Sequence, residues 1–266
     1  MLGIAVDIDG TLVDEAGDLY PATAETLARY WPGARVILAS ARPPQGIRYI
    51  LERLGLDGPY IALNGGIISP GKGQPPLVGN PIPAAVFTSV CGVTLSKKSI
   101  KALFIYGAEE WFAWGDAAVI AQEKALTSAA PTIVQDLAGF RPAGVVKLLV
   151  ACGGKASWIQ TSELLSGRFG GICTVRRSRP CYVEITATDV TKGVALENCR
   201  RLFHLEKCVA IGDGLNDLDM FKAADISYAT PEAPSELKKQ ATYVLEPPHD
   251  DSLAELFLRL LTGTKK

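Results

Sequence analysis

The chain has 266 residues, of which 48% are hydrophobic and 21% charged, and its formal net charge is −1. This length and composition are typical of a globular protein with one large domain or two modest ones. A net charge near zero gives no global field that would attract nucleic acid or an acidic membrane surface. No apolar run reaches the roughly 18 residues of a membrane span, so we expect a soluble protein without nucleic-acid or membrane partners.

The cysteine pattern indicates a reducing compartment. Six cysteines are present without CxxC spacing, and the sequence begins without the charged and apolar regions of a signal peptide. Reduced thiols in a cytoplasmic protein are therefore expected, rather than a disulfide framework or a zinc site.

Short apolar strands alternate with helical patterns near the start of the chain. The pattern predicts strands over 2–8, 34–40 and 59–66, the last ending in a turn, and helices over 21–31 and 43–55. A segment rich in Pro and Gly (69–83) then leads out of this region, and its composition is compatible with a hairpin.

The middle of the chain is richer in alternating strands. Strands are predicted over 86–95, 101–107, 144–152, 171–178 and 181–187, and helices over roughly 114–129 and 155–166. This pattern suits an antiparallel sheet with helices on one face, an α+β insert spanning residues 80–188.

The strand–helix alternation returns after the insert. Helices are predicted over 191–204, 216–225, 234–241 and 251–263, and strands over 206–213, 226–230 and 242–247. Continuous apolar strands alternating with helices imply a parallel sheet covered on both faces. The predicted fold is therefore a doubly wound α/β core, formed by residues 1–79 and 189–266, that carries the α+β insert.

Two aspartates follow the first predicted strand, in GIAVDIDGTLVDE (3–15). Side chains two positions apart on a strand point the same way, so Asp7 and Asp9 are expected to bring their carboxylates together. Like charges in a low-dielectric site raise each other's pKa. Either a cation neutralises the pair, or one acid is held protonated, or both.

A second acidic segment, CVAIGDGLNDLDMFKAAD (208–225), runs from a buried strand into Gly-Asp-Gly. Acids at the carboxyl end of a strand lie where open α/β sheets bind ligands. Asp213 is expected to complete a metal site with Asp7, and oxygen ligands of this kind suit Mg²⁺. Taken alone, the segment is equally compatible with a solvated turn and a helix cap at Asp217; together with the first acidic segment it favours a site.

Four segments in this order, DIDGTLVD, ILASARP, TKGVAL and IGDGLNDLDMFKAAD, resemble the motifs of the haloacid dehalogenase superfamily of phosphatases. The large insert, and ALNGG before it, resemble the Cof-type branch, subclass IIB, in which the insert is a cap. The resemblance spans the whole chain. It implies Mg²⁺-dependent hydrolysis of a small phosphomonoester, a sugar phosphate or a related metabolite, through an aspartyl-phosphate.

The resemblance also implies roles for individual residues. Asp7 is the expected nucleophile, Asp9 the general acid and then the base, and Lys192 the cation that orients Asp7 and neutralises the phosphoryl group. The expected metal ligands are Asp7, Asp9 (through its backbone carbonyl), Asp213 and Asp217, the last also suited to holding Lys192 from behind. The residues expected to contact phosphate or substrate are Gly10 and Thr11 (through backbone N–H groups), Ser40, Ala41, Arg42, Asn64 and Asn216. The family more often has Thr-Gly-Arg where this chain has Ser40-Ala41-Arg42.

Several alternatives stay open at this point. Arg42 could equally well form an ion pair at the surface, and Asn64 could equally well serve only to form the turn. A phosphotransferase or mutase would use the same nucleophile, and a metabolite-sensing protein would keep the fold without turnover. The expected partner is a small phosphorylated metabolite, and the chain is expected to be a monomer or homodimer.

For some residues of the insert and for both histidines, a structural role is an alternative to a role in the site. Arg176, Arg177 and Arg179 form a dense basic run, read as a solvated strand edge or as an anion contact. Either Lys147 or Glu184 has a position compatible with the substrate cleft. His204 and His249 lack partner spacing for a metal or a catalytic triad, so structural roles are expected for them.

Overall fold

The computed structural model describes residues 1–31 and 36–263. The chain forms two compact units. Unit 1 comprises Met1–Ala41, Ile47–Leu77 and Thr191–Lys266, and unit 2 comprises Arg42–Gly46 and Val78–Val190. No helix of the described residues combines the length and the apolar character needed to cross a bilayer.

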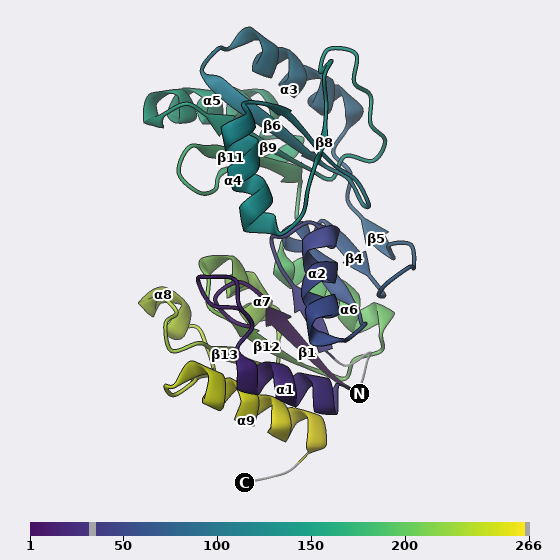
Figure 1. Ribbon diagram of the computed structural model, residues 1–266, viewed down its shortest axis with the longest axis vertical. Coiled ribbons are helices and arrows are strands. Elements are labelled where there is room, and N and C mark those ends of the chain that lie inside the picture. The colour runs from purple at the N-terminus through teal and green to yellow at the C-terminus, as the bar shows by residue number, and fades with distance from the viewer. Residues whose placement is uncertain (32–35, 264–266) are drawn as a thin grey trace. The chain divides into compact units, whose positions relative to one another are not determined.

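Unit 1 is built on a mostly parallel sheet (Figure 1). Its strands are β1 (Leu2–Asp7), β2 (Val36–Ala39), β3 (Tyr60–Ala62), β4 (Ile67–Ser69), β12 (Lys207–Gly212), β13 (Ile226–Ala229) and β14 (Tyr243–Val244). They follow the order β14-β13-β12-β1-β2-β3-β4, in which only β4 pairs antiparallel, with β3. The predicted α/β class with a parallel sheet is confirmed.

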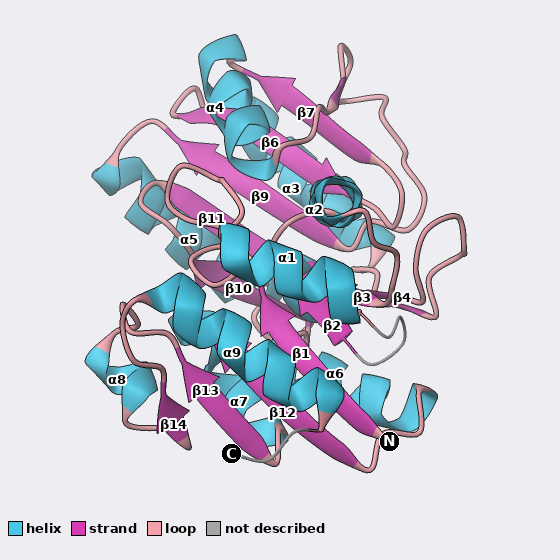
Figure 2. Cartoon of the chain, turned by 60° about the horizontal axis from the view of Figure 1, so that its bottom comes forward, coloured by secondary structure: helices cyan, strands magenta, loops and turns pink. Residues whose placement is uncertain are grey.

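Helices cover both faces of this sheet, as Figure 2 shows. They are α1 (Pro21–Tyr30), α2 (Pro44–Leu54), α6 (Lys192–Leu202), α7 (Leu218–Ala223), α8 (Ser235–Lys238) and α9 (His249–Thr262). Helices α1 and α9 lie side by side, and α6 packs against α7. Because both faces are covered, Ile4, Ala5 and Val6 of the central strand β1 are fully buried whichever way they point.

Three predicted elements of unit 1 differ in their bounds. Residues 34 and 35 of the predicted strand 34–40 lie outside the described residues. The predicted strand 59–66 ends at Ala62, because Leu63 (φ 53°) and Asn64 (φ 56°) take the left-handed conformation, which no strand continues through. The predicted helix 216–225 is a 3-10 turn, η2 (Leu215–Asp217), followed by α7.

Unit 2 contains a second sheet and three helices. The chain enters it through β5 (Val78–Gly79) and continues through α3 (Ala84–Ser96), β6 (Ile100–Tyr106), β7 (Trp111–Gly115), α4 (Ala117–Thr127), β8 (Thr132–Ile133), β9 (Lys147–Cys152), α5 (Lys155–Phe169), β10 (Cys173–Arg177) and β11 (Tyr182–Ala187). The sheet order is β10-β11-β9-β6-β7-β8. All of its pairs are antiparallel except β7 with β8, so the predicted α+β character is observed.

The predicted strand 86–95 is wrong, because these residues belong to helix α3. Its β-branched apolar residues favour a strand locally. In the structure, however, Val86, Phe87, Val90 and Cys91 recur at helical spacing and are buried in the core of unit 2. Tertiary burial therefore outweighs the local strand propensity.

The prediction that helices cover one face of this sheet is also wrong. Leu103 and Ile105 of β6 pack into the core with residues of α3 and α5. Tyr106, which points to the opposite face, donates a hydrogen bond to Glu123 of α4 at 2.9 Å. Both faces of the sheet are therefore covered.

Candidate active site

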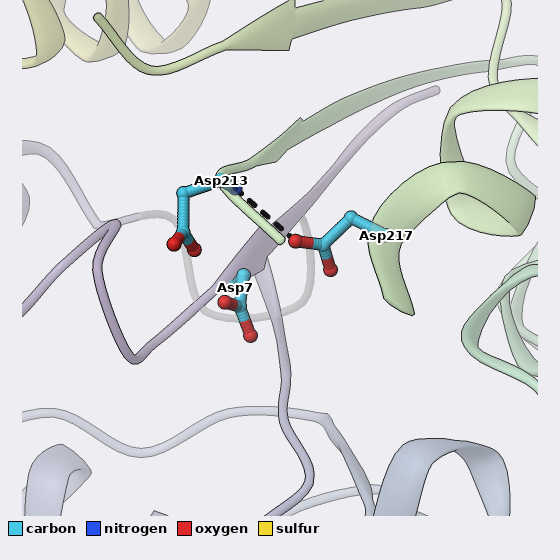
Figure 3. A group of neighbouring side chains, drawn as sticks. All are labelled: Asp7, Asp213 and Asp217. Carbon is cyan, nitrogen blue, oxygen red and sulfur yellow. Dashed lines mark hydrogen bonds between the residues drawn. The ribbon is translucent and has the colours of Figure 1, made fainter. Parts of the chain in front are cut away.

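The carboxyl ends of two neighbouring parallel strands bring distant acids together in unit 1. Strand β1 ends at Asp7, and its parallel neighbour β12 ends at Gly212, directly before Asp213. The turn η2 adds Asp217. One carboxylate oxygen from each of these three residues lies within 4.8 Å of the others, and Figure 3 shows the three side chains around a common space.

Lys192 joins two of these acids. It is the first residue of α6, whose N-cap residue Thr191 accepts a hydrogen bond from the Val194 N–H at 3.2 Å. Its buried Nζ lies 2.6 Å from Oδ1 of Asp7 and 2.6 Å from Oδ1 of Asp217. Burial alone would lower the pKa of this ammonium, but Asp217 and Asp7 outweigh burial and raise the pKa above its ordinary value. Lys192 is therefore a cation at neutral pH.

Gly65 lets α6 begin at this place. Its φ is +109°, and a Cβ at this residue would lie 2.3 Å from the carbonyl oxygen of Thr191. Only glycine combines this conformation with so close an approach to the start of the helix. The Gly-Gly turn of the sequence thus has a role in placing Lys192.

Asp217 holds both Lys192 and the loop before it. Its Oδ1 accepts from Lys192, and its Oδ2 accepts from the backbone N–H groups of Asp213 at 3.1 Å and Gly214 at 2.9 Å. The side chain is fully buried. With three donors already on its two oxygens, Asp217 is better suited to fixing Lys192 and the Asp213 loop than to binding a cation directly.

The remaining two acids are held in conditions that disfavour their charge. Burial raises the pKa of Asp7 well above its ordinary value, and the negative charges of Asp217 and Asp213 raise it further despite the opposing effect of Lys192. Burial likewise raises the pKa of Asp213, with a smaller contribution from Asp217. A divalent cation between Asp7 and Asp213 would remove this repulsion.

The position of Asp9 differs from the prediction. Because β1 ends at Asp7, Asp9 lies in the following turn rather than on the same strand face, and the carboxylates that raise the pKa of Asp7 are Asp217 and Asp213. The Asp9 side chain is exposed and accepts a hydrogen bond from the Ser40 hydroxyl at 3.3 Å. This arrangement places Asp9 where it can meet a group entering from solvent.

The turn after β1 uses the backbone N–H groups that were expected to face phosphate. The Gly10 N–H donates to the Val13 carbonyl at 2.9 Å, and the Thr11 N–H donates to the Ile8 carbonyl at 3.2 Å. These bonds close the turn, and the prediction that both groups face phosphate stays a prediction. The Thr11 side chain instead donates to Oδ1 of Asp213 at 3.2 Å.

Gly10 lies against the side chain of the metal-ligand candidate Asp213. Its φ is +83°, and a Cβ at this position would lie 2.3 Å from Oδ2 of Asp213. A side chain at this position would therefore displace the Asp213 carboxylate.

Ser40, Asn64 and Asn216 form a polar group beside the acids. The Asn64 N–H donates to the Ser40 carbonyl at 3.0 Å, and the Asn216 amide donates to Oδ1 of Asn64 at 3.3 Å. Ala41 is exposed beside Ser40. Arg42 is buried and belongs to the segment grouped with unit 2, where its guanidinium lies 3.5 Å from the Ser128 hydroxyl.

Sequence reasoning missed one residue that contacts this loop. His249 lies 238 positions from Thr11, and its Nε2 lies 3.0 Å from the Thr11 carbonyl oxygen. No motif or spacing connects the two residues, because the contact depends on α9 packing beside α1. Only the folded chain reveals it.

The donor set fits a hard divalent cation. Mg²⁺ prefers oxygen ligands and is commonly bound by one or two carboxylates together with water and substrate phosphate. Asp7 and Asp213 supply such carboxylates, and a cation between them would offset the burial and the neighbouring charges that raise their pKa values.

Comparison with known proteins gives a consistent result. The family model for haloacid dehalogenase-like hydrolases matches residues 4–257. A Haemophilus influenzae protein provisionally named a phosphatase is 25% identical over 224 residues, which cover 82% of this chain and 80% of the relative.

Two solved structures share the fold along the whole chain. A haloacid dehalogenase-like hydrolase from Bacteroides thetaiotaomicron superposes with a TM-score of 0.85 at 28% identity, covering 97% of this chain and 98% of that one. The subclass IIB sugar phosphatase BT4131 superposes with a TM-score of 0.76 at 19% identity, covering 98% and 99%.

Proposed function

Since this chain belongs to the haloacid dehalogenase-like hydrolases, in the Cof-type branch, and is a phosphatase, we propose that it hydrolyses a small phosphomonoester with Mg²⁺ through an aspartyl-phosphate on Asp7. The observation that carries the proposal is the buried Lys192 ammonium, 2.6 Å from both Asp7 and Asp217, beside Asp213. A carboxylate held in this way by one cation, with a second acid beside it, suits attack on an anionic phosphoryl group.

In the first step Asp7 acts as the nucleophile. Lys192 holds Oδ1 of Asp7, so we assign Oδ2 as the atom that bonds to phosphorus. The ester oxygen of the substrate leaves with a proton donated by Asp9, and the product alcohol is released. The phosphoryl group is then covalently attached to Asp7.

In the second step Asp9 acts as the base. It takes a proton from a water molecule whose oxygen attacks phosphorus, and the bond from phosphorus to Asp7 breaks. Inorganic phosphate leaves, and both aspartates return to their starting states. Before substrate binds, the Ser40 hydroxyl donates to Asp9 at 3.3 Å and orients its carboxylate; in the complex this hydroxyl is proposed to turn to the phosphoryl group.

Mg²⁺ would be held by Asp7, Asp213 and the Asp9 carbonyl, and would neutralise charge on the phosphoryl oxygens. Lys192 supplies the fixed positive charge that the chain itself contributes. Asp217 keeps Lys192 and the Asp213 loop in place through its three hydrogen bonds. Ser40, Asn64 and Asn216 offer hydroxyl and amide groups to phosphate or substrate.

We propose sugar phosphates or related metabolites as the substrate class, supported by the likeness in fold to a subclass IIB sugar phosphatase. Residues 80–188 are proposed to act as the cap that selects the leaving group and excludes water. A small phosphorylated metabolite is accordingly the proposed partner, and a monomer or homodimer the proposed assembly.

A phosphate-release screen over a library of phosphorylated metabolites, with Mg²⁺ and with EDTA, tests the proposal. The wild type is expected to release phosphate from a subset of the library only with Mg²⁺. Asp7→Asn is expected to lose at least about 10³-fold in kcat, because an amide cannot serve as the nucleophile. Wild-type velocity in Asp7→Asn would refute the nucleophile, and product formation that requires an added acceptor alcohol would identify a phosphotransferase instead.

A further inference from the structure

His249 connects the start of α9 to the turn that follows β1. Its Nε2 lies 3.0 Å from the backbone carbonyl oxygen of Thr11, and its Nδ1 lies 2.9 Å from Oε2 of Glu232. The His249 side chain is 5% exposed, whereas that of Glu232 is 63% exposed. The imidazole is therefore enclosed, with both nitrogens in contact with oxygen atoms.

The partners of the imidazole decide which nitrogen carries a proton. A backbone carbonyl oxygen only accepts, so Nε2 must be the donor toward Thr11. This bond is present in the neutral ring with its proton on Nε2 and in the protonated ring alike. The Glu232 carboxylate accepts a hydrogen bond only when Nδ1 also carries a proton. When Nδ1 carries none, the Glu232 side chain can turn to water, because it is exposed. The bond to Thr11 is thus the constant one.

Thr11 connects the turn to the acids of the site through its hydrogen bonds. Its hydroxyl donates to Oδ1 of Asp213, while its own N–H and those of Leu12 and Val13 all donate to the Ile8 carbonyl, at 3.2, 2.8 and 3.0 Å. This turn also carries Asp9. A donor that fixes the Thr11 carbonyl therefore fixes the turn and its hold on Asp213.

The position of the imidazole is fixed by contacts with Tyr20 and by the attachment of α9 to α1. Its ring stacks on Tyr20 with centroids 4.4 Å apart. The next residue, Asp250, accepts from the backbone N–H groups of Ala22 at 2.9 Å and Thr23 at 2.8 Å, at the start of α1. The first turn of α9 is thereby tied to the first turn of α1.

We propose that His249 is a positioning residue for phosphoryl transfer, which acts by donating from Nε2 to the Thr11 carbonyl and so keeps the turn over residues 8–13 in its reactive arrangement. It does not touch the substrate. The inference rests on the proposed function for its effect on catalysis, while its effect on the turn stands independently.

Four variants separate this role from general stability. His249→Phe keeps an aromatic ring to stack on Tyr20 and loses the donor, whereas His249→Gln returns an N–H at a similar reach. Glu232→Gln leaves the Nε2 donor in place. His204→Phe, at the other histidine of the chain, which is exposed, is the matched control.

Two measurements on the full chain are made for each variant. The first is kcat and KM on p-nitrophenyl phosphate with Mg²⁺. The second is amide hydrogen exchange, followed by mass spectrometry, in a peptide over residues 8–20 and in a reference peptide over residues 207–212. The second measurement does not depend on turnover.

His249→Phe is expected to lower kcat about tenfold with KM changed less than about twofold, and to speed exchange in residues 8–20 about tenfold with the reference unchanged, as the loss of one buried hydrogen bond implies. His249→Gln is expected to restore both to within about threefold of wild type, and Glu232→Gln and His204→Phe to leave both unchanged. Wild-type kcat and exchange in His249→Phe would overturn the proposal. So would equal loosening of both peptides without rescue by Gln, since that is the result of a purely structural role. A wild type inactive on p-nitrophenyl phosphate and across the metabolite screen would refute the proposed function, and exchange in residues 8–20 would still decide the role of His249.

Discussion

The ammonium of Lys192 lies 2.6 Å from Oδ1 of Asp7, although 185 positions separate the two residues in the chain. The same ammonium lies 2.6 Å from Asp217, so one buried cation neutralises part of the charge of two buried carboxylates. Removing the cation or one of the carboxylates is therefore expected to alter the stability of the fold as well as its activity.

Lys192→Met is expected to abolish turnover and to destabilise the fold by about 3 kcal/mol or more, because it leaves two buried carboxylates without their cation. The double variant Lys192→Met/Asp7→Asn is expected to regain part of this stability without activity, since one of those charges is removed. Urea unfolding with EDTA, alongside phosphate release, measures both. A single variant as stable as the wild type would contradict the assigned electrostatic role.

The contribution of Asp7 and Asp213 to the stability of the metal-free protein is expected to fall as pH rises above about 4. The folded-state pKa values of Asp7 and Asp213 are raised above their unfolded value of about 3.9, so the folded state binds more protons there than the unfolded state does. The stability that these groups contribute is fully present below the unfolded pKa and is lost as pH rises through the folded pKa. Asp7→Asn is expected to weaken this dependence, and comparison of its urea unfolding with that of the wild type from pH 4 to 8 isolates the contribution of Asp7.

Mg²⁺ is expected to restore this lost stability most strongly at the higher pH values, where the carboxylates are ionised. Saturation at about 100 times the dissociation constant would add about 2.7 kcal/mol to the free energy of unfolding. Thermal unfolding with Mg²⁺ and with EDTA measures the effect. An equal stabilisation of wild type and an Asp213→Asn variant would argue against the assigned ligand.

Gly10→Ala is expected to impair Mg²⁺ binding, because the new Cβ would lie 2.3 Å from Oδ2 of Asp213. Gly17→Ala is the matched control: its φ of +84° is close to the +83° of Gly10, but nothing lies within 4 Å of its Cβ position. Both variants bear a backbone cost of about 1 kcal/mol, so only Gly10→Ala should need at least about tenfold more Mg²⁺ for half-maximal activity. If the two variants needed the same Mg²⁺ concentration for half-maximal activity, the proposed clash between the Cβ and Asp213 would be contradicted.

Asp9→Asn is expected to slow hydrolysis of sugar phosphates far more than that of aryl phosphates, whose phenolate leaves without a proton. General acid catalysis is worth about 10²–10⁴-fold, and a loss within this range is expected for an alkyl leaving group. Single-turnover rates on glucose 6-phosphate and p-nitrophenyl phosphate give the comparison. Equal losses on both substrates would count against proton donation by Asp9.

The sequence by itself determined the fold class, the family and the candidate residues of the site. Apolar runs such as residues 2–8 and 206–213 are local signals, and buried parallel strands require them whatever the rest of the chain does. The order of the motifs around Asp7, Ser40, Lys192 and Asp213 can also be read directly from the sequence. Asp7, Ser40 and Asp213 do lie at the carboxyl ends of the neighbouring strands β1, β2 and β12, and Lys192 begins helix α6.

The tertiary structure alone decided the contacts that depend on distant segments or on single backbone angles. Asp9 leaves the strand face because β1 stops at Asp7, and the N–H groups of Gly10 and Thr11 donate to carbonyls of the turn that follows. The segment 86–95 becomes a helix because burial against the unit 2 sheet outweighs its β-branched composition. The hold of His249 on Thr11 joins residues 238 positions apart, and no local pattern encodes it because only the packing of α9 beside α1 brings them together.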